Sequence, residues 1–234
     1  MTAEFILNEL FSVANPEKAL LLQRFFKTGK GQYAEGDVFL GLVVPLSRSI
    51  ARANKETPLS ELQLLLDSPY HEARLVALVI IVERFKKASS SGRTELFGFY
   101  LRNAARINNW DLVDVTCPHV VGAYLLDKDR SVLYSLAGSS LLWEQRIAIV
   151  STIAFIRSKQ FDDTLALSEM LLSHKHDLMH KAVGWMLREV GKRDKVTLLS
   201  FLERNATRMP RTALRYAIEH FPGEERMYFM KKKD

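Results

Sequence analysis

Apolar residues recur at intervals of three and four along most of the chain. Near the N-terminus the pattern runs through Phe5, Leu7, Leu10, Phe11, Leu20, Leu21, Phe25 and Phe26. This spacing places apolar side chains on one face of an α-helix. The chain has no good run of alternating apolar and polar residues, and no Asn-Gly or Asp-Gly pair that would mark a hairpin turn. We therefore predict an all-α protein.

Proline and glycine mark where the predicted helices begin and break. Asn15-Pro16-Glu17 offers a cap, a proline at the first helical position and an early acid, and prolines 58 and 210 lie at similar starts. Lys27–Asp37 holds three glycines and is predicted to be a loop, and Ser89–Gly92 a shorter break. Helical pattern resumes on both sides of each segment, so we predict one domain over residues 1–234.

A repeat becomes visible when the predicted helices are compared. Basic or aromatic residues followed by small and apolar ones recur about every 35 positions, at Arg74, Trp110, Arg146, Lys181 and Arg215. Further helices are expected between them, near residues 94–107, 130–136, 164–173 and 196–204. Two helices per unit at this period predict a solenoid, a curved superhelix of antiparallel helix pairs. A plain helical bundle is the alternative.

In such a solenoid, equivalent positions line one face. One helical turn after each residue of the series lie Leu78, Asp114, Val150, Trp185 and Glu219. Trp110 and Asp114 then share a stripe in one unit, and Lys181 and Trp185 share the matching stripe in a later one. If the second helices line the concave side, the two indoles and the carboxylate face one groove.

Charge and cysteine content narrow the functional classes. The net charge of +6 and the isoelectric point near 9.4 favour an anionic partner, with nucleic acid ahead of a membrane surface, although a mildly basic protein without such a partner fits equally. The single Cys117 excludes an internal disulfide, and no Cys/His cluster has zinc-ligand spacing. The N-terminus lacks the features of a signal peptide, and the apolar stretch 75–82 is too short to span a bilayer. We expect a cytoplasmic protein.

Three short motifs resemble those of the AlkD-like DNA alkylation-repair family, whose members are built from HEAT-like helical repeats. Residues 110–114 read Trp-Asp-Leu-Val-Asp, residues 145–148 read Gln-Arg-Ile-Ala, and residues 184–189 read Gly-Trp-Met-Leu-Arg-Glu. The resemblance covers nearly the whole chain, and three motifs in the right order make it fairly specific. One departure is Asn109, where related proteins can carry a second tryptophan.

The resemblance implies a role for each motif residue. Asp114 is then the catalytic carboxylate, and Trp110 and Trp185 flank the lesion. The DNA backbone is contacted by Arg146, Arg188 and Lys181. The implied partner is double-stranded DNA with alkylated bases, bound by a monomer in a bacterial cytoplasm. Neither a metal, a cofactor nor an obligate protein partner is implied.

The implied reaction is hydrolysis of the N-glycosidic bond of cationic N-alkylated purines such as 3-methyladenine and 7-methylguanine, in base excision repair. Such a base leaves as a neutral molecule, so the enzyme mainly has to stabilise the positive charge that develops on the sugar. One ionised carboxylate near C1′ supplies that stabilisation, and it can also position the attacking water. Indole faces attract cations by about 0.5 to 2 kcal/mol. No lysine is placed as a nucleophile, so we expect no strand-cleaving lyase activity.

Other interpretations of the same residues remain open. The protein could be a non-catalytic HEAT-repeat scaffold that binds nucleic acid or protein, or a relative that binds alkylated or branched DNA without excising bases. The tryptophans could be core residues and Asp114 a capping acid. Arg146 and Arg188 could pair with Glu144 and Glu189. Asp114 is the residue that best separates the catalytic interpretation from the non-catalytic ones, because a groove that only binds phosphates gains nothing from a carboxylate facing DNA.

Overall fold

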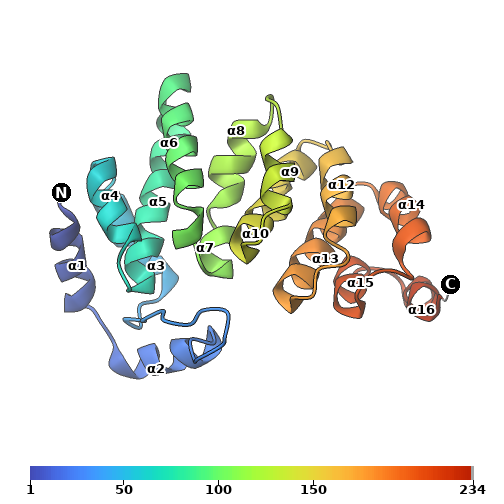
Figure 1. Cartoon of the computed structure of the whole chain (residues 1–234), viewed down its shortest axis with the longest axis horizontal. Coiled ribbons are helices and arrows are strands. Elements are labelled where there is room, and N and C mark those ends of the chain that lie inside the picture. The colour runs from blue at the N-terminus through green and yellow to red at the C-terminus, as the bar shows by residue number, and fades with distance from the viewer. Residues whose placement is uncertain (233–234) are drawn as a thin grey trace. The chain divides into compact units, whose positions relative to one another are not determined.

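The computed structural model describes residues 1–232, and helices joined by loops make up that part of the chain (Figure 1). The one β-type contact among these residues is an isolated bridge between Val38 and Tyr70. The prediction of an all-α protein is confirmed. The chain divides into two compact units, Met1–Val120 and Val121–Asp234, and each is described by itself. The single domain over residues 1–234 stays a prediction.

The N-terminal unit is built around one long buried helix. Its elements are α1 (Ala3–Ser12), α2 (Pro16–Phe25), α3 (Val44–Ala53), α4 (Leu59–Leu66), α5 (His71–Lys87), α6 (Ser90–Arg102), the 3-10 helix η1 (Ala104–Arg106) and α7 (Trp110–Asp114). The π-helical turn η2 (Pro118–Gly122) runs across the boundary between the units. Helices α1, α3, α4, α6 and α7 all pack against α5, whose residues from His71 to Val82 are buried without exception. The stretch 75–82 is apolar all round because it forms the centre of the unit.

The C-terminal unit is arranged around α13 in the same way. Its helices are α8 (Ala123–Leu125), α9 (Ser131–Ala137), α10 (Leu142–Ser151), α11 (Ile153–Arg157), α12 (Asp162–Met170), α13 (Asp177–Gly191), α14 (Lys195–Asn205), α15 (Arg211–Ala217) and α16 (Gly223–Lys231). Helix α10 packs against α9 and α13, and α13 packs in turn against α12, α14 and α15. The second helices of successive pairs therefore lie side by side.

The repeat predicted from the sequence is visible within each unit. Arg146, Lys181 and Arg215 lie on α10, α13 and α15, which pack in that order. Arg74 and Trp110 lie on α5 and α7, which also pack together. Trp110 is the first residue of its helix, whereas the other four lie in or near the second turn, so the spacing holds but the register slips at α7. The helical repeat architecture is confirmed.

The helix starts and loops predicted from cap residues, prolines and glycines agree with the structure to within a few residues. Asn15 caps α2 by accepting a hydrogen bond from the Lys18 amide, with Pro16 at the first helical position. Prolines 58 and 210 stand one residue before α4 and α15 rather than inside them. Lys27–Asp37 is a chain of turns, as predicted. The predicted break at Ser89–Gly92 is wrong in extent: Ser89 caps α6 by accepting from the Gly92 amide, so the helix has already begun at Ser90. In residues 1–232, no helix is both long enough and apolar enough to cross a membrane.

Candidate functional site

The short helix α7 carries the first motif and presents two of its side chains together. Asn109 caps the helix, because its side-chain oxygen accepts from the Trp110 amide at 2.9 Å. Leu112 and Val113 are fully buried, whereas Trp110, Asp111 and Asp114 are half-buried. The inner face of α7 therefore packs into the unit, and the half-buried indole of Trp110 and carboxylate of Asp114 lie on its outer face. The four-residue spacing of Trp110 and Asp114 places them one turn apart on that face.

Trp110 is held by an aromatic cluster at the end of α2. Its ring stacks on Phe26 with centroids 5.3 Å apart, and the edge of Phe25 approaches it at 6.1 Å. The indole Nε1 donates a hydrogen bond to the Tyr33 hydroxyl at 3.2 Å. Phe25 is 63% exposed, so the cluster reaches the surface. Trp110 itself is half-buried at the edge of this cluster.

Asp114 ends α7 next to a buried hydroxyl. Tyr100 is fully buried, and its hydroxyl lies 2.7 Å from the Thr116 hydroxyl. Burial holds the pKa of Tyr100 well above its ordinary value, and the electrostatic influence of Cys117 and Asp114 raises it further. Asp114 is thus a carboxylate on the rim of the core, with water on one side and an apolar interior on the other.

A buried polar network lies beneath α7, and sequence reasoning missed it. The imidazole of His71, on α5, bridges two carboxylates: Nε2 lies 2.9 Å from Asp111 Oδ2 and Nδ1 lies 3.4 Å from Asp37 Oδ2. Asp37 also accepts from the Arg74 guanidinium at 2.6 Å, and the side-chain amides of Asn108 and Asn109 donate to it. Asp37 closes the 27–37 loop, so it ties that loop to α5 and to the start of α7.

The charges in this network support one another. Burial disfavours the imidazolium of His71, but the hydrogen bonds to Asp111 and Asp37 outweigh it and raise the pKa of His71 to about 8. Burial likewise works against the charge of Asp37, and the bonds from His71 and Arg74 overcome it and lower the pKa of the carboxyl. The ring of His71 also stacks on Phe39, with centroids 4.3 Å apart. The bridge of His71 to its carboxylates is therefore ionic at neutral pH and mostly buried.

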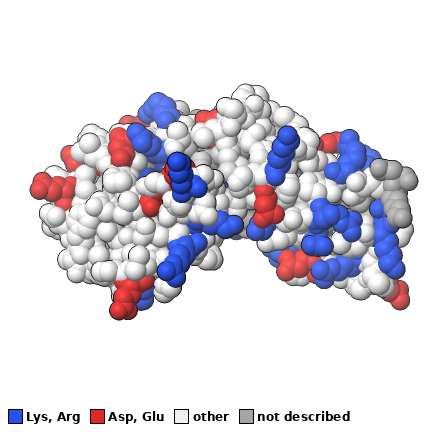
Figure 2. All heavy atoms as spheres, turned by 60° about the horizontal axis from the view of Figure 1, so that its bottom comes forward, with Lys and Arg blue, Asp and Glu red and all other residues white. Residues whose placement is uncertain are grey.

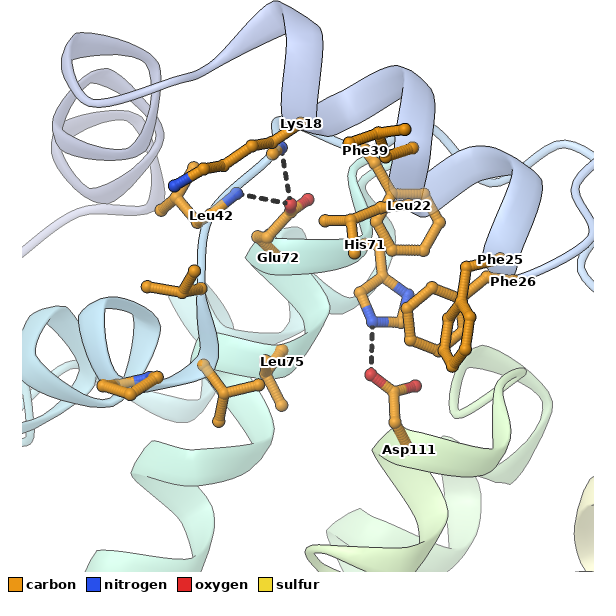
Figure 3. A pocket seen from close by; sticks show the side chains of 15 residues that line it. Lys18, Leu22, Phe25, Phe26, Phe39, Leu42, His71, Glu72, Leu75 and Asp111 are labelled. Carbon is orange, nitrogen blue, oxygen red and sulfur yellow. Dashed lines mark hydrogen bonds and ion pairs between the residues drawn. The ribbon is translucent and has the colours of Figure 1, made fainter.

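An apolar pocket of about 490 Å³ opens beside this network (Figure 3). Figure 3 shows Asp111 reaching from α7 toward His71, with Phe25 and Phe26 beside the imidazole. Glu72 also lines the pocket, where its carboxylate accepts from the backbone amides of three consecutive residues, Leu40, Gly41 and Leu42. No cluster of His, Cys, Asp or Glu suited to holding a metal ion occurs in the described part of the chain.

Arg146, in the second motif, is a buried residue of the C-terminal unit. Its side chain is only 4% exposed, and Nη1 donates to the backbone carbonyl of Leu178 at 2.6 Å. This bond joins α10 to the first turn of α13. A phosphate contact by Arg146 stays a prediction, and it would require the guanidinium to leave this position.

The third motif lies on α13. Trp185 and Arg188 are half-buried, and the more exposed Lys181 pairs with Asp177 at 2.7 Å. Arg188 forms ion pairs with Glu219 and, more loosely, with Glu189. The pairing of Arg188 with Glu189 was one of the open interpretations of the sequence. Both cations are thus paired with carboxylates of the same unit, and their contact with DNA phosphates stays a prediction.

Basic side chains gather on the C-terminal unit. Figure 2 shows Lys and Arg side chains close together on the face of this unit that is in view. The unit carries most of the basic residues and most of the net positive charge of the chain. Such a surface favours a polyanion.

Comparisons with known proteins identify the family. The model of the DNA alkylation repair enzyme family matches residues 6–221. The chain is also similar in structure to a protein described as a predicted DNA alkylation repair enzyme from Enterococcus faecalis, with a TM-score of 0.70, 16% sequence identity, and coverage of 90% of this chain and 97% of that one. At that identity the likeness shows the fold. No curated protein matches the sequence.

The chain is thus an all-helical repeat protein. It belongs to the DNA alkylation repair enzyme family, as the three motifs indicated.

Proposed function

We propose that this protein is a monofunctional DNA glycosylase that excises cationic N-alkylated purines, 3-methyladenine and 7-methylguanine, from duplex DNA. The observation that carries the proposal is the outer face of α7, where an indole and a carboxylate, Trp110 and Asp114, lie one turn apart in a member of a DNA alkylation repair family. A cationic base that stacks on an indole, beside a carboxylate able to face the sugar, meets the two requirements of this reaction.

Asp114 is the catalytic carboxylate in this proposal. It stabilises the positive charge that develops on the deoxyribose as the base departs, and it orients the attacking water. Its place between solvent and the apolar interior favours this role, because a carboxylate with little surrounding water exerts a stronger field on a nearby cation. The alkylated base needs no protonation to leave, so one carboxylate suffices.

Trp110 and Trp185 are proposed to bind the lesion, each from its own motif. Lys181 and Arg188 are proposed to contact DNA phosphates, which would position the duplex without reading its sequence. Arg146 is included by its motif, although its burial favours a supporting role for α13.

The test of catalysis is release of 7-methylguanine from methylated duplex DNA by the wild-type protein and by Asp114→Asn. We expect release by the wild type and a strong reduction in the variant, which keeps the size of the side chain and removes its charge. Asp67→Asn is the matched control, because Asp67 is an exposed acid of the same unit that pairs with Arg106. DNA binding without release by either protein would refute the proposal and favour a non-catalytic scaffold.

The test of the aromatic role separates charge from shape. The measurement compares binding affinities for duplexes containing 7-methylguanine and its uncharged isostere 7-methyl-7-deazaguanine. The wild type should bind the cationic lesion more tightly, and this preference should be smaller in Trp110→Leu or Trp185→Leu. A cation held on one indole face is worth about 0.5 to 2 kcal/mol, so we expect a discrimination of several-fold to be lost. Equal discrimination by wild type and variants would contradict the aromatic role while leaving catalysis by Asp114 untouched.

A further inference from the structure

The helix that carries Trp110 and Asp114 cannot hold its own position. Helix α7 has five residues, whereas isolated helices shorter than about 12 residues are marginal even with favourable sequences. Its geometry must therefore come from contacts with other elements. Packing of Leu112 and Val113 supplies one part, and the polar network beneath the helix supplies the other.

We propose that His71 is a positioning residue for the proposed reaction, because its imidazole fixes α7 through Asp111 and so sets the placement of Trp110 and Asp114. The proposal rests on the proposed function. Asp111 follows Trp110 directly, and it is the residue of α7 to which the long helix α5 is hydrogen-bonded. A side chain that is 2% exposed and stacked on an aromatic ring has little freedom to move.

The geometry requires the protonated form of His71. Both ring nitrogens face carboxylate oxygens, of Asp111 at 2.9 Å and of Asp37 at 3.4 Å. An imidazolium donates from both nitrogens, whereas a neutral imidazole donates from one and presents a lone pair at the other. Loss of the proton therefore turns one of these two contacts into a repulsion between a lone pair and a carboxylate.

The surrounding charges are balanced only when His71 is protonated. The groups that face or neighbour the ring are Asp37 from the loop, Asp111 from α7, Arg74 and Glu72 from α5, and Lys18 from α2 across the pocket. Asp37 and Asp111 oppose Arg74 and the imidazolium, while Glu72 is occupied by three backbone amides. The pKa of about 8 means that the bridge is complete at neutral pH and opens in mild alkali.

The aromatic stack gives a second path from His71 to the site. Phe26 stands between the imidazole, 5.4 Å away, and the indole of Trp110, 5.3 Å away. A shift of the imidazole therefore affects Trp110 from below through Asp111 and from the side through Phe26.

The first experiment measures single-turnover release of 7-methylguanine and DNA affinity for wild type and His71→Gln. We expect the rate to fall about tenfold to a hundredfold, the size of effect that small misplacements of reacting groups produce, with DNA affinity almost unchanged. The wild-type rate should also fall as pH rises through about 8, and the variant should lack that fall. His119→Gln, an exposed histidine of the same unit, is the control.

The second experiment follows the indole N–H signal of Trp110 by NMR, assigned with Trp110→Phe. The signal should move with a midpoint near pH 8 in the wild type and stay still in His71→Gln. In Asp111→Asn the midpoint should move to lower pH, because the Asp111 charge and hydrogen bond raise the pKa of His71. A purely structural role for His71 predicts lower stability in both variants and no change in any midpoint.

These outcomes separate the two proposals. If the wild type releases no base, the proposed function fails, and the indole signal still decides whether His71 controls α7. If His71→Gln does not fold, Asp111→Asn provides the same two measurements. A folded His71→Gln variant with the wild-type rate, pH profile and indole titration would overturn the inference.

Discussion

Gly184 of α13 lies directly against the backbone of Ala213 in α15. A Cβ atom at position 184 would stand 2.4 Å from the Ala213 carbonyl oxygen and 2.5 Å from Cβ of Tyr216. The glycine therefore permits the close approach of two helices that form the centre of the C-terminal unit. A glycine inside a helix is unfavourable by about 1 kcal/mol, and this packing explains its presence beside Trp185.

Gly184→Ala should consequently destabilise the protein, although alanine is the better helix former. Overpacking costs about 1–3 kcal/mol, and we expect the upper end because the obstructing atom belongs to the backbone and cannot rotate aside. The free energy of unfolding in urea measures this effect. In a chain of this size the melting temperature should fall by several degrees.

Gly98→Ala is the matched control for this prediction. Gly98 lies inside α6, and the nearest atom to an added Cβ would be the Arg102 Nη1, at 3.2 Å, which is the end of a flexible side chain. Alanine there should be neutral or stabilise by up to about 1 kcal/mol. Equal effects at the two positions would contradict the packing explanation of Gly184.

Asp37→Asn should be among the most destabilising single changes in the N-terminal unit. The substitution leaves Arg74 and His71 as buried cations facing a neutral amide. Removing one partner of a buried ion pair costs about 3–5 kcal/mol, because the remaining charge stays desolvated. Thermal or urea unfolding provides the measurement.

Asp67→Asn again serves as the comparison, since the pair of Asp67 with Arg106 is exposed on both sides. Exposed pairs are worth about 0–1 kcal/mol. If Asp37→Asn lowered the free energy of unfolding no more than Asp67→Asn does, the buried network would contribute little to stability.

The stability of the protein should decline in mild alkali because of His71. Its pKa is raised from 6.5 to about 8 in the folded state. The stabilisation is complete below pH 6.5, where the folded and unfolded states both carry the proton, and it disappears as pH rises through about 8. This difference between the pKa values of His71 in the folded and unfolded states corresponds to about 2 kcal/mol in the free energy of unfolding. Urea unfolding from pH 6 to 9 should show the loss in the wild type and a smaller one in His71→Gln. If the difference in the free energy of unfolding between the two proteins stayed constant from pH 6 to 9, the raised pKa could not belong to His71.

The sequence was most informative where structure depends on neighbours along the chain. Helical periodicity, the cap at Asn15 and the glycines of the 27–37 loop act over a few residues, and all three were recognised correctly. The repeat could also be detected, because each unit must present similar residues to the next one. These signals were sufficient for the fold class and the motif positions.

The network around His71 could not be predicted in the same way. Its bonds join Asp37, His71 and Asp111, which are separated by 34 and 40 residues, and no spacing rule connects them. Asp111 lies in the first turn of α7, where an acid is favoured whatever its partners, so its position does not reveal the bond to His71. The burial of Arg146 was missed for a related reason, since an arginine is normally exposed and its carbonyl partner leaves no trace in the sequence.

The proposed phosphate contacts can be distinguished by the salt dependence of DNA binding. Each phosphate contact contributes about 0.9 to the slope of log affinity against log salt concentration. Lys181→Ala and Arg188→Ala should therefore each lower the slope by about 1 and weaken binding to all sequences alike. Each side chain would exchange its present carboxylate partner, Asp177 or Glu219, for a phosphate.

Arg146→Gln should behave differently from those two variants. The buried guanidinium is bonded to the Leu178 carbonyl, so its removal leaves a buried acceptor without that donor and costs about 1–3 kcal/mol of stability. The salt slope should stay at the wild-type value once binding is measured well below the melting temperature. Arg157→Ala, an exposed basic residue on α11, controls for loss of charge alone. If Arg146→Gln lowers the slope by as much as Arg188→Ala with stability intact, then Arg146 leaves its buried position to bind DNA, and its role is the one that its motif implies.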